Sequence, residues 1–436
     1  MSMRVEIDNY RALDFTGVEQ VEDKFIEGLN KLKDSEANWT YLKPLILFLK
    51  YCTNCHMCNR ACHVYLKGKK NIYSPSYRSW LLKKLKKKRD LNSILTLAES
   101  AYRCNLCRRC TLYCPLSIDN GLIAREIRKL FSQELNVAPK EFHSQGSMKQ
   151  LRNGSSTGLT SSGFMDIVRF IEEDIEERTG RKIKIPVDEK GADMLLIHNA
   201  GDYLNRLESI EAFAIILEEA DLSWTLSSEA YDAVNYGMWY DDVQLIRIAS
   251  KNLRIARELD VDRIVVGECG HAHRAMITIA DRIDEHQIKK ESCIPLLWNL
   301  VKNKLNLCPE KNDFPVTLHD PCNIVRQLGI FEPQRKILKK ICPRFIEMSP
   351  NGFYNYCCGS GGGIGIIGSM RDFRMNVSGK MKFEQIMDVF DKCVESRKYV
   401  CAPCSNCKRA ISELFSSSGH EIESIGIVDL IFNIMI

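Results

Sequence analysis

Cysteine thiols are the side chains whose number and spacing point most directly to chemistry in this chain. The sequence has 19 cysteines, and eight of them form two runs with gaps of two, two and three residues: Cys52, Cys55, Cys58, Cys62, Cys104, Cys107, Cys110 and Cys114. Met1–Tyr10 lacks the charged and then apolar pattern of a signal peptide. A chain kept inside the cell holds its thiols reduced, so we expect metal ligands or redox groups before disulfides.

The spacing of the two runs favours iron–sulfur clusters over zinc. Three closely spaced thiolates cap one face of a cubane [4Fe-4S] cluster, and in two-cluster ferredoxins the fourth cysteine of each run ligates the other cluster. One cluster would then be held by Cys52, Cys55, Cys58 and Cys114, and the other by Cys104, Cys107, Cys110 and Cys62. Four-cysteine zinc sites also use paired thiols, but zinc requires neither the third nor the fourth cysteine of each run. The pattern departs from that of ferredoxins at His63, which replaces the usual proline, and in the 41 residues between the runs.

A second set of cysteines lies in the C-terminal part of the chain: Cys322, Cys357, Cys358, Cys404 and Cys407. Adjacent cysteines cannot both point into a corner of a cubane cluster without strain, whereas five thiolates at these spacings suit an expanded, non-cubane cluster. The glycine-rich segment after the adjacent cysteines contains Gly359 and Gly361. It would let backbone amides approach the cluster and leave room for a bulky thiol substrate. The alternative is a nucleotide-binding loop, although the strand and helix that such a loop requires are missing.

Six cysteines lie outside these sets: Cys269, Cys293, Cys308, Cys342, Cys393 and Cys401. Most are expected to be buried small apolar side chains. Cys401 precedes the last pair by another gap of two residues and is an alternative ligand. Two roles are open for Cys269, His271 and His273. They either have a purely structural role at the start of a helix, or they assist catalysis, since histidine can protonate a leaving thiolate near neutral pH.

The elements around these residues predict a multi-domain α+β and α/β architecture. A helical two-cluster domain (1–142) is followed by a linker and lead-in segment (143–189), in which residues 143–164 are rich in Ser, Gly and Thr. Two α/β halves follow, 190–305 and 306–436. We expect strands at Met194–His198, Arg263–Val266, Val316–His319 and Lys398–Val400. We expect helices at Asp242–Leu259, Ala272–Ile283, Arg371–Phe390 and Ser405–Phe415.

The two α/β halves contain a faint internal repeat. IHNAGDY aligns with LHDPCNI at an offset of 121 residues, AVNYGM with NYCCGS at 122, and RIVVGECGHAHRA with KYVCAPCSNCKRA at 135. At the five ligand positions the first half offers Gly201, Asn235, Tyr236, Cys269 and Ala272. One thiol cannot hold the cluster that five would hold, so the first half is expected to be degenerate.

The order of these domains resembles the catalytic HdrD subunit of heterodisulfide reductase and the DsrK, TmcB and HmcF subunits of related complexes, the Cys-Cys-Gly (CCG) family. The resemblance implies that the complete half holds one non-cubane [4Fe-4S] cluster that acts on a disulfide, with Cys322, Cys357, Cys358, Cys404 and Cys407 as its catalytic ligands. It also implies a complex on the cytoplasmic face of the membrane. The partners would be a membrane cytochrome b-type subunit and other redox subunits, and in the DsrK-like branch the small thiol protein DsrC.

Basic residues cluster near the two runs, although the net charge is only +5. Leu81–Asp90 reads LLKKLKKKRD, and further cations lie near the second run: Arg108, Arg109, Arg125, Arg128 and Lys129. These are either a solvated helix face or a docking surface for an acidic partner or an anionic membrane. No aromatic residues interleave with the charges, so we do not expect nucleic acid to bind. Leu42–Tyr51 fits either a core helix or a subunit contact.

Two functions of different classes agree with these features. In the first, the chain is an oxidoreductase subunit that reduces or forms a disulfide. In the second, it relays electrons between a quinone or cytochrome partner and a soluble partner without a substrate of its own. The iron–sulfur subunit of anaerobic glycerol-3-phosphate dehydrogenase shares the domain order, but no flavin site is recognisable in this sequence.

Overall fold

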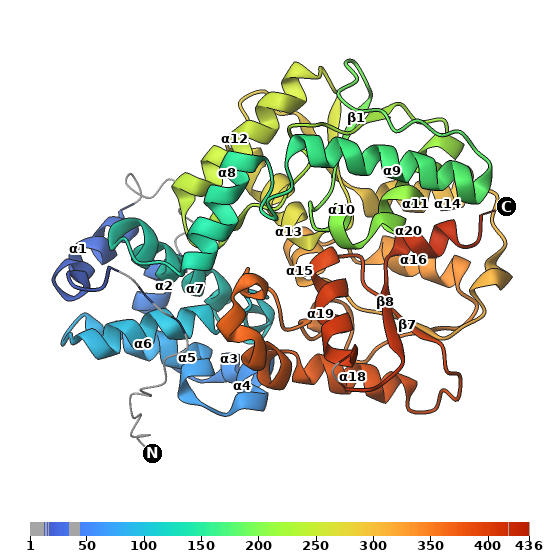
Figure 1. Cartoon of the computed structure of the whole chain (residues 1–436). Coiled ribbons are helices and arrows are strands. Elements are labelled where there is room, and N and C mark those ends of the chain that lie inside the picture. The colour runs from blue at the N-terminus through green and yellow to red at the C-terminus, as the bar shows by residue number, and fades with distance from the viewer. Residues whose placement is uncertain (1–12, 14, 16, 35–43, 417, 436) are drawn as a thin grey trace. The chain divides into compact units, whose positions relative to one another are not determined.

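The computed structural model describes residues 13, 15, 17–34, 44–416 and 418–435, drawn in colour in Figure 1. Met1–Tyr10 and the first two residues of the Leu42–Tyr51 stretch lie outside the described residues. The chain forms two compact units. Unit 1 contains Met1–Ser144, Tyr236–Gln244 and Tyr356–Lys382, and unit 2 contains Gln145–Asn235, Leu245–Asn355 and Phe383–Ile436.

Unit 1 is helical, and Figure 1 shows its first helices in blue to teal. They are α1 (Val21–Lys33), α2 (Pro44–Tyr51), α3 (Met57–Ala61), α4 (His63–Gly68), α5 (Pro75–Leu85), α6 (Leu91–Tyr102) and α7 (Asn120–Lys129), with the π-helix η3 (Leu130–Glu134) continuing α7. Ser74, Asp90 and Asp119 accept backbone N–H bonds at the starts of α5, α6 and α7, as N-cap residues do. Phe25 and Phe131 lie in the apolar core of this unit.

Unit 2 contains two four-stranded parallel sheets with the same strand order. The first has the order β2-β1-β3-β4, and the second has the order β6-β5-β7-β8. The strands are β1 (Met194–Ile197), β2 (Trp224–Thr225), β3 (Arg263–Val266), β4 (Lys289–Ser292), β5 (Val316–Leu318), β6 (Phe345–Ile346), β7 (Lys398–Cys401) and β8 (Ile422–Ile425). In the central pairs Leu195 is opposite Ile264, and Thr317 is opposite Val400.

Helices cover both sheets, as parallel sheets require. In the first half they are α10 (Asp202–Asn205), α11 (Leu207–Glu219), α12 (Asp242–Glu258), α13 (Gly270–His273) and α14 (Cys293–Asn303). In the second half they are α15 (Cys322–Leu328), α16 (Glu332–Ile341), α18 (Lys380–Phe390), α19 (Ser405–Ser416) and α20 (Ile427–Phe432). Helix α11 packs on α20 and α14 packs on α16, so one apolar core serves both sheets.

Both halves send an equivalent segment to unit 1. Tyr236–Gln244 follows β2 and leads into α12, and Tyr356–Lys382 follows β6 and leads into α18. The second segment carries the short helices α17 (Arg371–Phe373) and η12 (Arg374–Ser378). This correspondence agrees with the internal repeat of the sequence, which aligned Tyr236 with Cys358.

The predicted fold class is confirmed: a helical N-terminal region precedes two parallel α/β regions. The four predicted strands are β1, β3, β5 and β7. Of the predicted helices, α12 and α19 are continuous, whereas the one at Ala272–Ile283 becomes π-helical after α13 (η6, Arg274–Ile279) and the one at Arg371–Phe390 is interrupted at Gly379.

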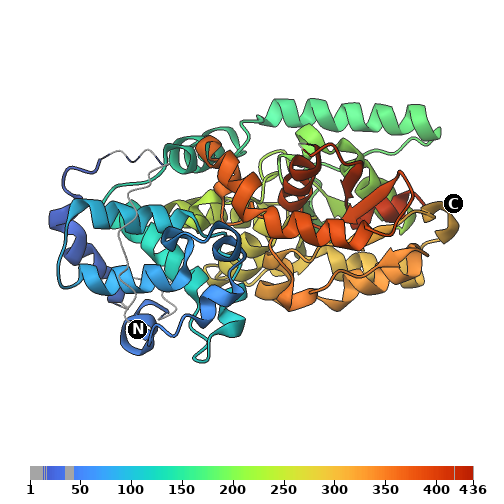
Figure 2. The same cartoon turned by 90° about the horizontal axis from the view of Figure 1, so that it is seen from below.

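The expectation of a loop at residues 143–164 is wrong for most of that segment. The π-helix η4 (Glu141–Met148) and α8 (Lys149–Asn153) occupy its first half, and α9 (Ser161–Thr179) begins within its last residues. Phe142 and Phe164, near its two ends, are buried and fix these helices, which composition alone does not reveal. Figure 2 shows α9, in green, as one long helix along the edge of unit 2. Every helix in the described part of the chain is too short or too polar to cross a membrane.

Candidate metal centres

The two cysteine runs of unit 1 have the same backbone conformation. In the first run Asn54 and His56 have positive φ angles of 60° and 63°, and in the second Leu106 and Arg108 have 51° and 61°. These residues occupy the second and fourth positions after the first cysteine of each run. Left-handed backbone at a residue other than glycine is uncommon and strained. Its repetition at matching positions indicates two loops that turn their thiols toward one centre each.

The structure groups the eight thiols crosswise between the runs. Burial raises the pKa of Cys58 to about 12, and the neighbouring charges that add to the rise are those of Cys52, Cys114 and Cys55. Burial likewise raises the pKa of Cys62 to about 12, with contributions from Cys104 and Cys107. Cys110 lies with Cys107, Cys104 and Cys62, and burial raises its pKa well above the ordinary value.

These two sets of thiols fit two iron–sulfur clusters. Four thiols packed together offer the donor set that a metal centre requires, and their mutual repulsion adds to the rise in pKa that burial causes. Each set draws its fourth thiol from the other run, which suits the ferredoxin arrangement and not two separate zinc sites.

His63, which stands where ferredoxins have proline, has a buried hydrogen-bonding role. Its Nε2 is 3.0 Å from Asn105 Oδ1, and the Asn105 side chain also donates from Nδ2 to the Gly359 carbonyl at 2.9 Å. Ser378 Oγ lies 2.7 Å from Asn105 Oδ1 and 2.8 Å from the Gly359 carbonyl oxygen, and its single proton can be donated to either acceptor. This His63–Asn105–Ser378 network joins both ferredoxin runs to the Cys-Cys-Gly loop within unit 1.

The glycine run packs against the backbone of the second ferredoxin run. A Cβ at Gly361 would lie 2.8 Å from the Asn105 carbonyl oxygen and 3.5 Å from Cys357 Sγ. Gly359 and Gly362 have φ angles of 91° and 68°, which side-chain-bearing residues rarely adopt. Short 3₁₀ turns, η10 (Ile364–Ile366) and η11 (Gly368–Met370), follow the run. The glycines therefore permit close packing, and the context of a nucleotide loop is absent from this described segment.

The five cysteines of the second set are all buried, and they divide between the units. Cys357 and Cys358 belong to the glycine loop of unit 1. Cys322 begins α15 directly after β5, Cys404 follows β7, and Cys407 lies in the first turn of α19. In unit 2 the three thiols thus lie at the carboxyl ends of adjacent parallel strands, where α/β sheets place their functional groups.

The degenerate half contributes a hydrogen bond to one of these thiols. Gly270 N–H donates to Cys404 Sγ at 3.2 Å, and a Cβ at Gly270 would lie 3.1 Å from the same sulfur. Cys269 is buried beside Cys404, and burial raises its pKa well above the ordinary value. His273 Nδ1 is 2.8 Å from the Cys269 carbonyl and its Nε2 is 2.7 Å from Ser292 Oγ. Burial lowers the pKa of His273 to about 4, and both ring nitrogens have hydrogen-bond partners, which favours the structural role of this residue over the catalytic one.

Three of the five remaining cysteines are buried among apolar side chains. Cys293, Cys342 and Cys401 lie in the apolar core of unit 2, and Cys308 and Cys393 are half-buried. For Cys401, the last residue of β7, this position favours the apolar role over the alternative of a ligand.

The expectation of a surface patch around the second run is wrong. Arg125 and Lys129 are buried and form ion pairs with Asp242, and Arg109 is buried as well. Arg108 is partly exposed and pairs with Asp119. Arg128 is fully buried and donates to the carbonyls of Gly362, Ala101 and Cys104. Residues 236–244 and the glycine loop cover these cations, and neither segment is near them in the sequence. In the Leu81–Asp90 run, residues 86–89 are exposed, whereas the Lys83 ammonium bonds the Cys52 carbonyl.

Sequence reasoning missed a buried carboxylate between the two halves of unit 2. Glu268 Oε1 accepts the Ile427 N–H at 2.7 Å, and Lys408 Nζ lies 3.6 Å from Oε2. Burial raises the pKa of Glu268 to about 7, and Lys408 opposes this rise. The carboxylate precedes Cys269 by one residue, but only the fold brings it to α20, so no sequence signal could have identified it.

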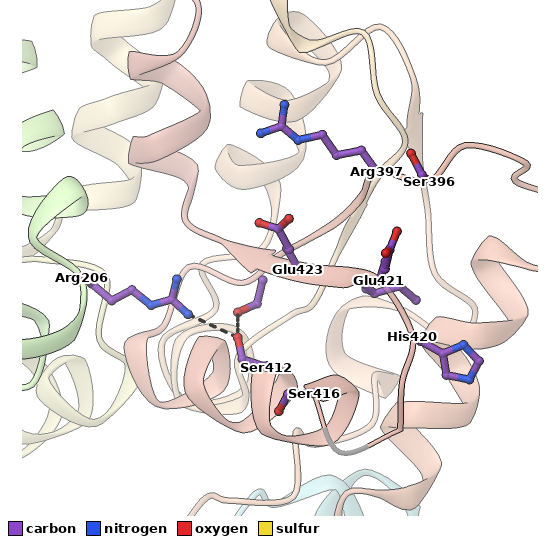
Figure 3. Close-up of a pocket in the computed structure, with 10 residues that line it drawn as sticks. Arg206, Ser396, Arg397, Ser412, Ser416, His420, Glu421 and Glu423 are labelled. Atoms are coloured by element: carbon purple, nitrogen blue, oxygen red, sulfur yellow. Dashed lines mark hydrogen bonds between the residues drawn. The ribbon is translucent and has the colours of Figure 1, made fainter. Parts of the chain in front are cut away.

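A cavity of about 690 Å³ in unit 2 lies between α19 and β8, and Figure 3 shows its lining. Arg206 points toward Ser412 there and donates to its Oγ at 3.3 Å. Arg397, Glu421 and Glu423 add mixed charge, and no cysteine lines the cavity. The cavity is therefore separate from the candidate metal ligands.

Comparisons with known proteins identify both cysteine regions. Residues 48–118 match the family model of the 4Fe-4S dicluster domain, and residues 316–412 match that of the cysteine-rich CCG domain. The chain is a relative of the heterodisulfide reductase-like iron–sulfur subunits. It is 26% identical over 392 residues to the Hdr-like menaquinol oxidoreductase iron–sulfur subunit 2 of Archaeoglobus fulgidus. The aligned region covers 76% of this chain and 70% of that protein.

Two further relatives show the range of proteins that share this arrangement. A subunit of the dihydromethanophenazine:CoB–CoM heterodisulfide reductase of Methanosarcina acetivorans is 22% identical over 417 residues, which cover 88% of this chain and 94% of that protein. The EtfAB:quinone oxidoreductase of Syntrophomonas wolfei is 24% identical over 273 residues, 61% of this chain and 37% of that protein. With its dicluster and cysteine-rich domains, the chain is an iron–sulfur electron-transfer subunit of the oxidoreductase class.

Proposed function

We propose that this protein passes electrons through two cubane [4Fe-4S] clusters to a non-cubane [4Fe-4S] cluster that reduces, or in reverse forms, a disulfide. The cubane ligands are Cys52, Cys55, Cys58 and Cys114 for the first cluster, and Cys104, Cys107, Cys110 and Cys62 for the second. The ligands of the non-cubane cluster are Cys322, Cys357, Cys358, Cys404 and Cys407.

The His63–Asn105–Ser378 network is the observation that carries this proposal. It ties the residue after Cys62 and the residue after Cys104 to the carbonyl of Gly359, directly after the Cys-Cys pair. Electron transfer between centres needs them close and held rigidly, and a buried network of hydrogen-bonded side chains holds a loop in one position. The second cubane cluster is thus the one that faces the Cys-Cys-Gly loop.

The first cubane cluster is the point of exchange with a partner. Cys55 is exposed, and Tyr51, next to Cys52, exposes 58% of its surface. Leu112 and Leu116, on either side of Cys114, expose 43% and 56%. Exposed apolar side chains around a ligand suit the contact surface of a redox partner. We assign this face to a membrane cytochrome b-type subunit, which would hold the protein at the cytoplasmic face of the membrane.

The chain's own residues shape the disulfide site. Gly359 and Gly361 let the loop that carries Cys357 and Cys358 pack against the backbones of Gly379 and Asn105. This packing holds the two cysteines in place for a thiol substrate such as the C-terminus of a DsrC-like protein. Gly270 N–H stabilises the Cys404 thiolate as a hydrogen-bond donor. The clusters supply the single electrons that thiolate exchange alone cannot provide.

Iron content and electron paramagnetic resonance test the proposal. Three clusters predict about 12 iron atoms per chain in anaerobically purified protein, against about 8 for the ferredoxin pair alone. An oxidised-state signal in the presence of thiol that disappears in Cys357→Ser and Cys358→Ser is the expected result. About 8 iron atoms without such a signal would contradict the disulfide site.

A relay without its own substrate is the second candidate. It is supported by the loss of four of five ligand positions in the first half and by similarity to the EtfAB:quinone oxidoreductase. Disulfide turnover stops in Cys358→Ser under the first proposal. Under the relay, electron transfer from a reduced donor to a soluble acceptor continues unchanged in that variant.

A further inference from the structure

Arg78 is a buried cation of unit 1 with little to compensate its charge. The side chain, on α5, is 1% exposed. Its Nη1 donates to the Ser100 carbonyl at 3.2 Å, and its Nε has no partner. Among the described residues, no carboxylate lies within ion-pair distance of the guanidinium. Burying an unpaired charge is strongly unfavourable, so a missing anion is required.

Other buried cations of the same unit have their compensation in the protein. Arg103 pairs with Glu99 at 2.7 Å, and Lys129 pairs with Asp242. Arg128 has no carboxylate, but it donates four hydrogen bonds to backbone carbonyls. Arg78 has one hydrogen bond for a group with five N–H donors.

The position of Arg78 shows where its anion belongs. The start of α5 is bound to the first cysteine run, because Asn59 Oδ1 accepts from Ser76 N–H at 3.2 Å and His56 Nδ1 is 2.8 Å from Ser76 Oγ. Arg78 lies two residues further along α5. Its guanidinium reaches Ser100 on α6, four residues before the first cysteine of the second run.

Arg78 lies close enough to one thiol of each group, Cys58 and Cys62, for its charge to act on both. Cys58 belongs to the first group of four thiols and Cys62 to the second. One guanidinium therefore acts on both groups.

We propose that Arg78 is the shared counter-ion of the two cubane clusters and sets their reduction potentials. The inference rests on the proposed two-cluster function. Each cluster held by four thiolates is anionic, and one-electron reduction adds a further negative charge. A fixed cation between the clusters stabilises the reduced state of both, and it does so without a protonation step because arginine stays charged.

Potentiometric titration of the clusters in the full-length protein tests the proposal. Arg78→Gln removes the charge and keeps a hydrogen-bond donor, and Arg78→Lys keeps the charge. We expect the reduction equilibrium of the cubane clusters to fall by about tenfold in Arg78→Gln, which is about 59 mV for one electron, and by less than about threefold in Arg78→Lys. Lys87→Gln removes an exposed, solvent-screened charge in the same unit and should leave both potentials unchanged.

The outcomes separate this inference from the proposed function. If wild-type protein contains no cubane signals, the two-cluster function is wrong. If the signals and iron are present and Arg78→Gln titrates like wild type, only the role of Arg78 is wrong. If Arg78→Gln fails to retain iron, retention in Arg78→Lys supports the counter-ion. Equal loss in both variants means that Arg78 acts through packing and overturns the proposal.

Discussion

The two α/β halves of unit 2 have the same backbone at the carboxyl ends of their strands and different chemistry there. Cys269 follows β3 and Cys404 follows β7, each by three residues, and each donates its N–H to the carbonyl two residues earlier at 2.6 Å. Only the second half adds Cys322 and Cys407 around this turn. The backbone of the turn is therefore a property of the topology, whereas ligation depends on single side chains that one half has lost.

The first half contributes structural support to the site of the second. Its Gly270 N–H donates to Cys404 Sγ, and its Glu268 binds the start of α20 through the N–H groups of Ile427 and Val428. Ser405 returns a hydrogen bond to the Glu268 carbonyl at 2.8 Å. A duplicated domain that no longer binds its own cluster can thus remain necessary as the frame of the other.

The largest expected effect, on iron content, comes from replacing the two equivalent cysteines by serine, one at a time. Cys404→Ser removes a proposed ligand, and we expect iron to fall from about 12 to about 8 atoms per chain, with loss of the thiol-dependent paramagnetic signal. Cys269→Ser should retain both, because its sulfur has a structural hydrogen bond with Ala272 N–H. Iron quantitation of the two variants tests this prediction. Loss of iron in both would mean that Cys269 of the first half also binds the cluster.

The sequence predicted those features that depend on local pattern. Cysteine spacing gave both ligand runs, and the strong β-branched segments gave β1, β3, β5 and β7. The duplicated topology followed from three short alignments, since equivalent turns need similar residues.

Long-range partners could not be predicted in this way. Arg125 and Lys129 look like surface cations in the sequence, yet Asp242, more than a hundred residues away, forms ion pairs with both, and Glu126 pairs with Arg125 as well. Asn105 has no distinguishing context beyond its place after Cys104, and its role depends on Gly359 and Ser378. Burial of a polar side chain is decided by the segment that covers it, and single-sequence patterns do not report that segment.

Different interactions hold the two equivalent segments of unit 1. Ion pairs hold Tyr236–Gln244, and neutral hydrogen bonds hold Tyr356–Lys382. Asp242→Ala removes the ion pairs of the buried Lys129 and Arg125, of which Arg125 keeps Glu126, and we expect a loss of about 3–5 kcal/mol in the free energy of unfolding. Asn105→Ala removes three neutral hydrogen bonds, two to Gly359 and Ser378 of the other segment and one to His63, and should cost about 2–3 kcal/mol. Urea unfolding followed by circular dichroism measures both, with the exposed Asp166→Ala as a control that should not differ from wild type. Equal losses in the two variants would contradict this ranking.

Glu268 occupies the position that Pro403 has in the second half, and its carboxylate makes the contact between halves sensitive to pH. Burial raises its pKa from 4.5 to about 7, with Lys408 and Asp429 as the charged neighbours. The folded protein therefore binds more protons than the unfolded chain between these values, and stability falls as pH rises from about 4.5 to about 7.

Glu268→Gln keeps the acceptor for Ile427 N–H and cannot ionise. Between pH 5 and 8 the wild type should lose up to about 3 kcal/mol relative to this variant, measured as the difference between their unfolding midpoints. Parallel pH profiles would show that the Glu268 carboxyl is ionised in the folded protein throughout.

Gly270→Ala gives the smallest effect and the sharpest test of the first half as a frame. The backbone at Gly270 is helical and tolerates alanine, but the new Cβ would lie 3.1 Å from Cys404 Sγ, so the sulfur must shift by a few tenths of an ångström. We expect retained iron and a shift of about two- to fivefold in the reduction equilibrium of the non-cubane cluster. Gly368→Ala, whose Cβ meets no atom within 4 Å, is the matched control. If the reduction equilibrium shifts no more in Gly270→Ala than in Gly368→Ala, the degenerate half positions the turn but does not act on the cluster ligand Cys404.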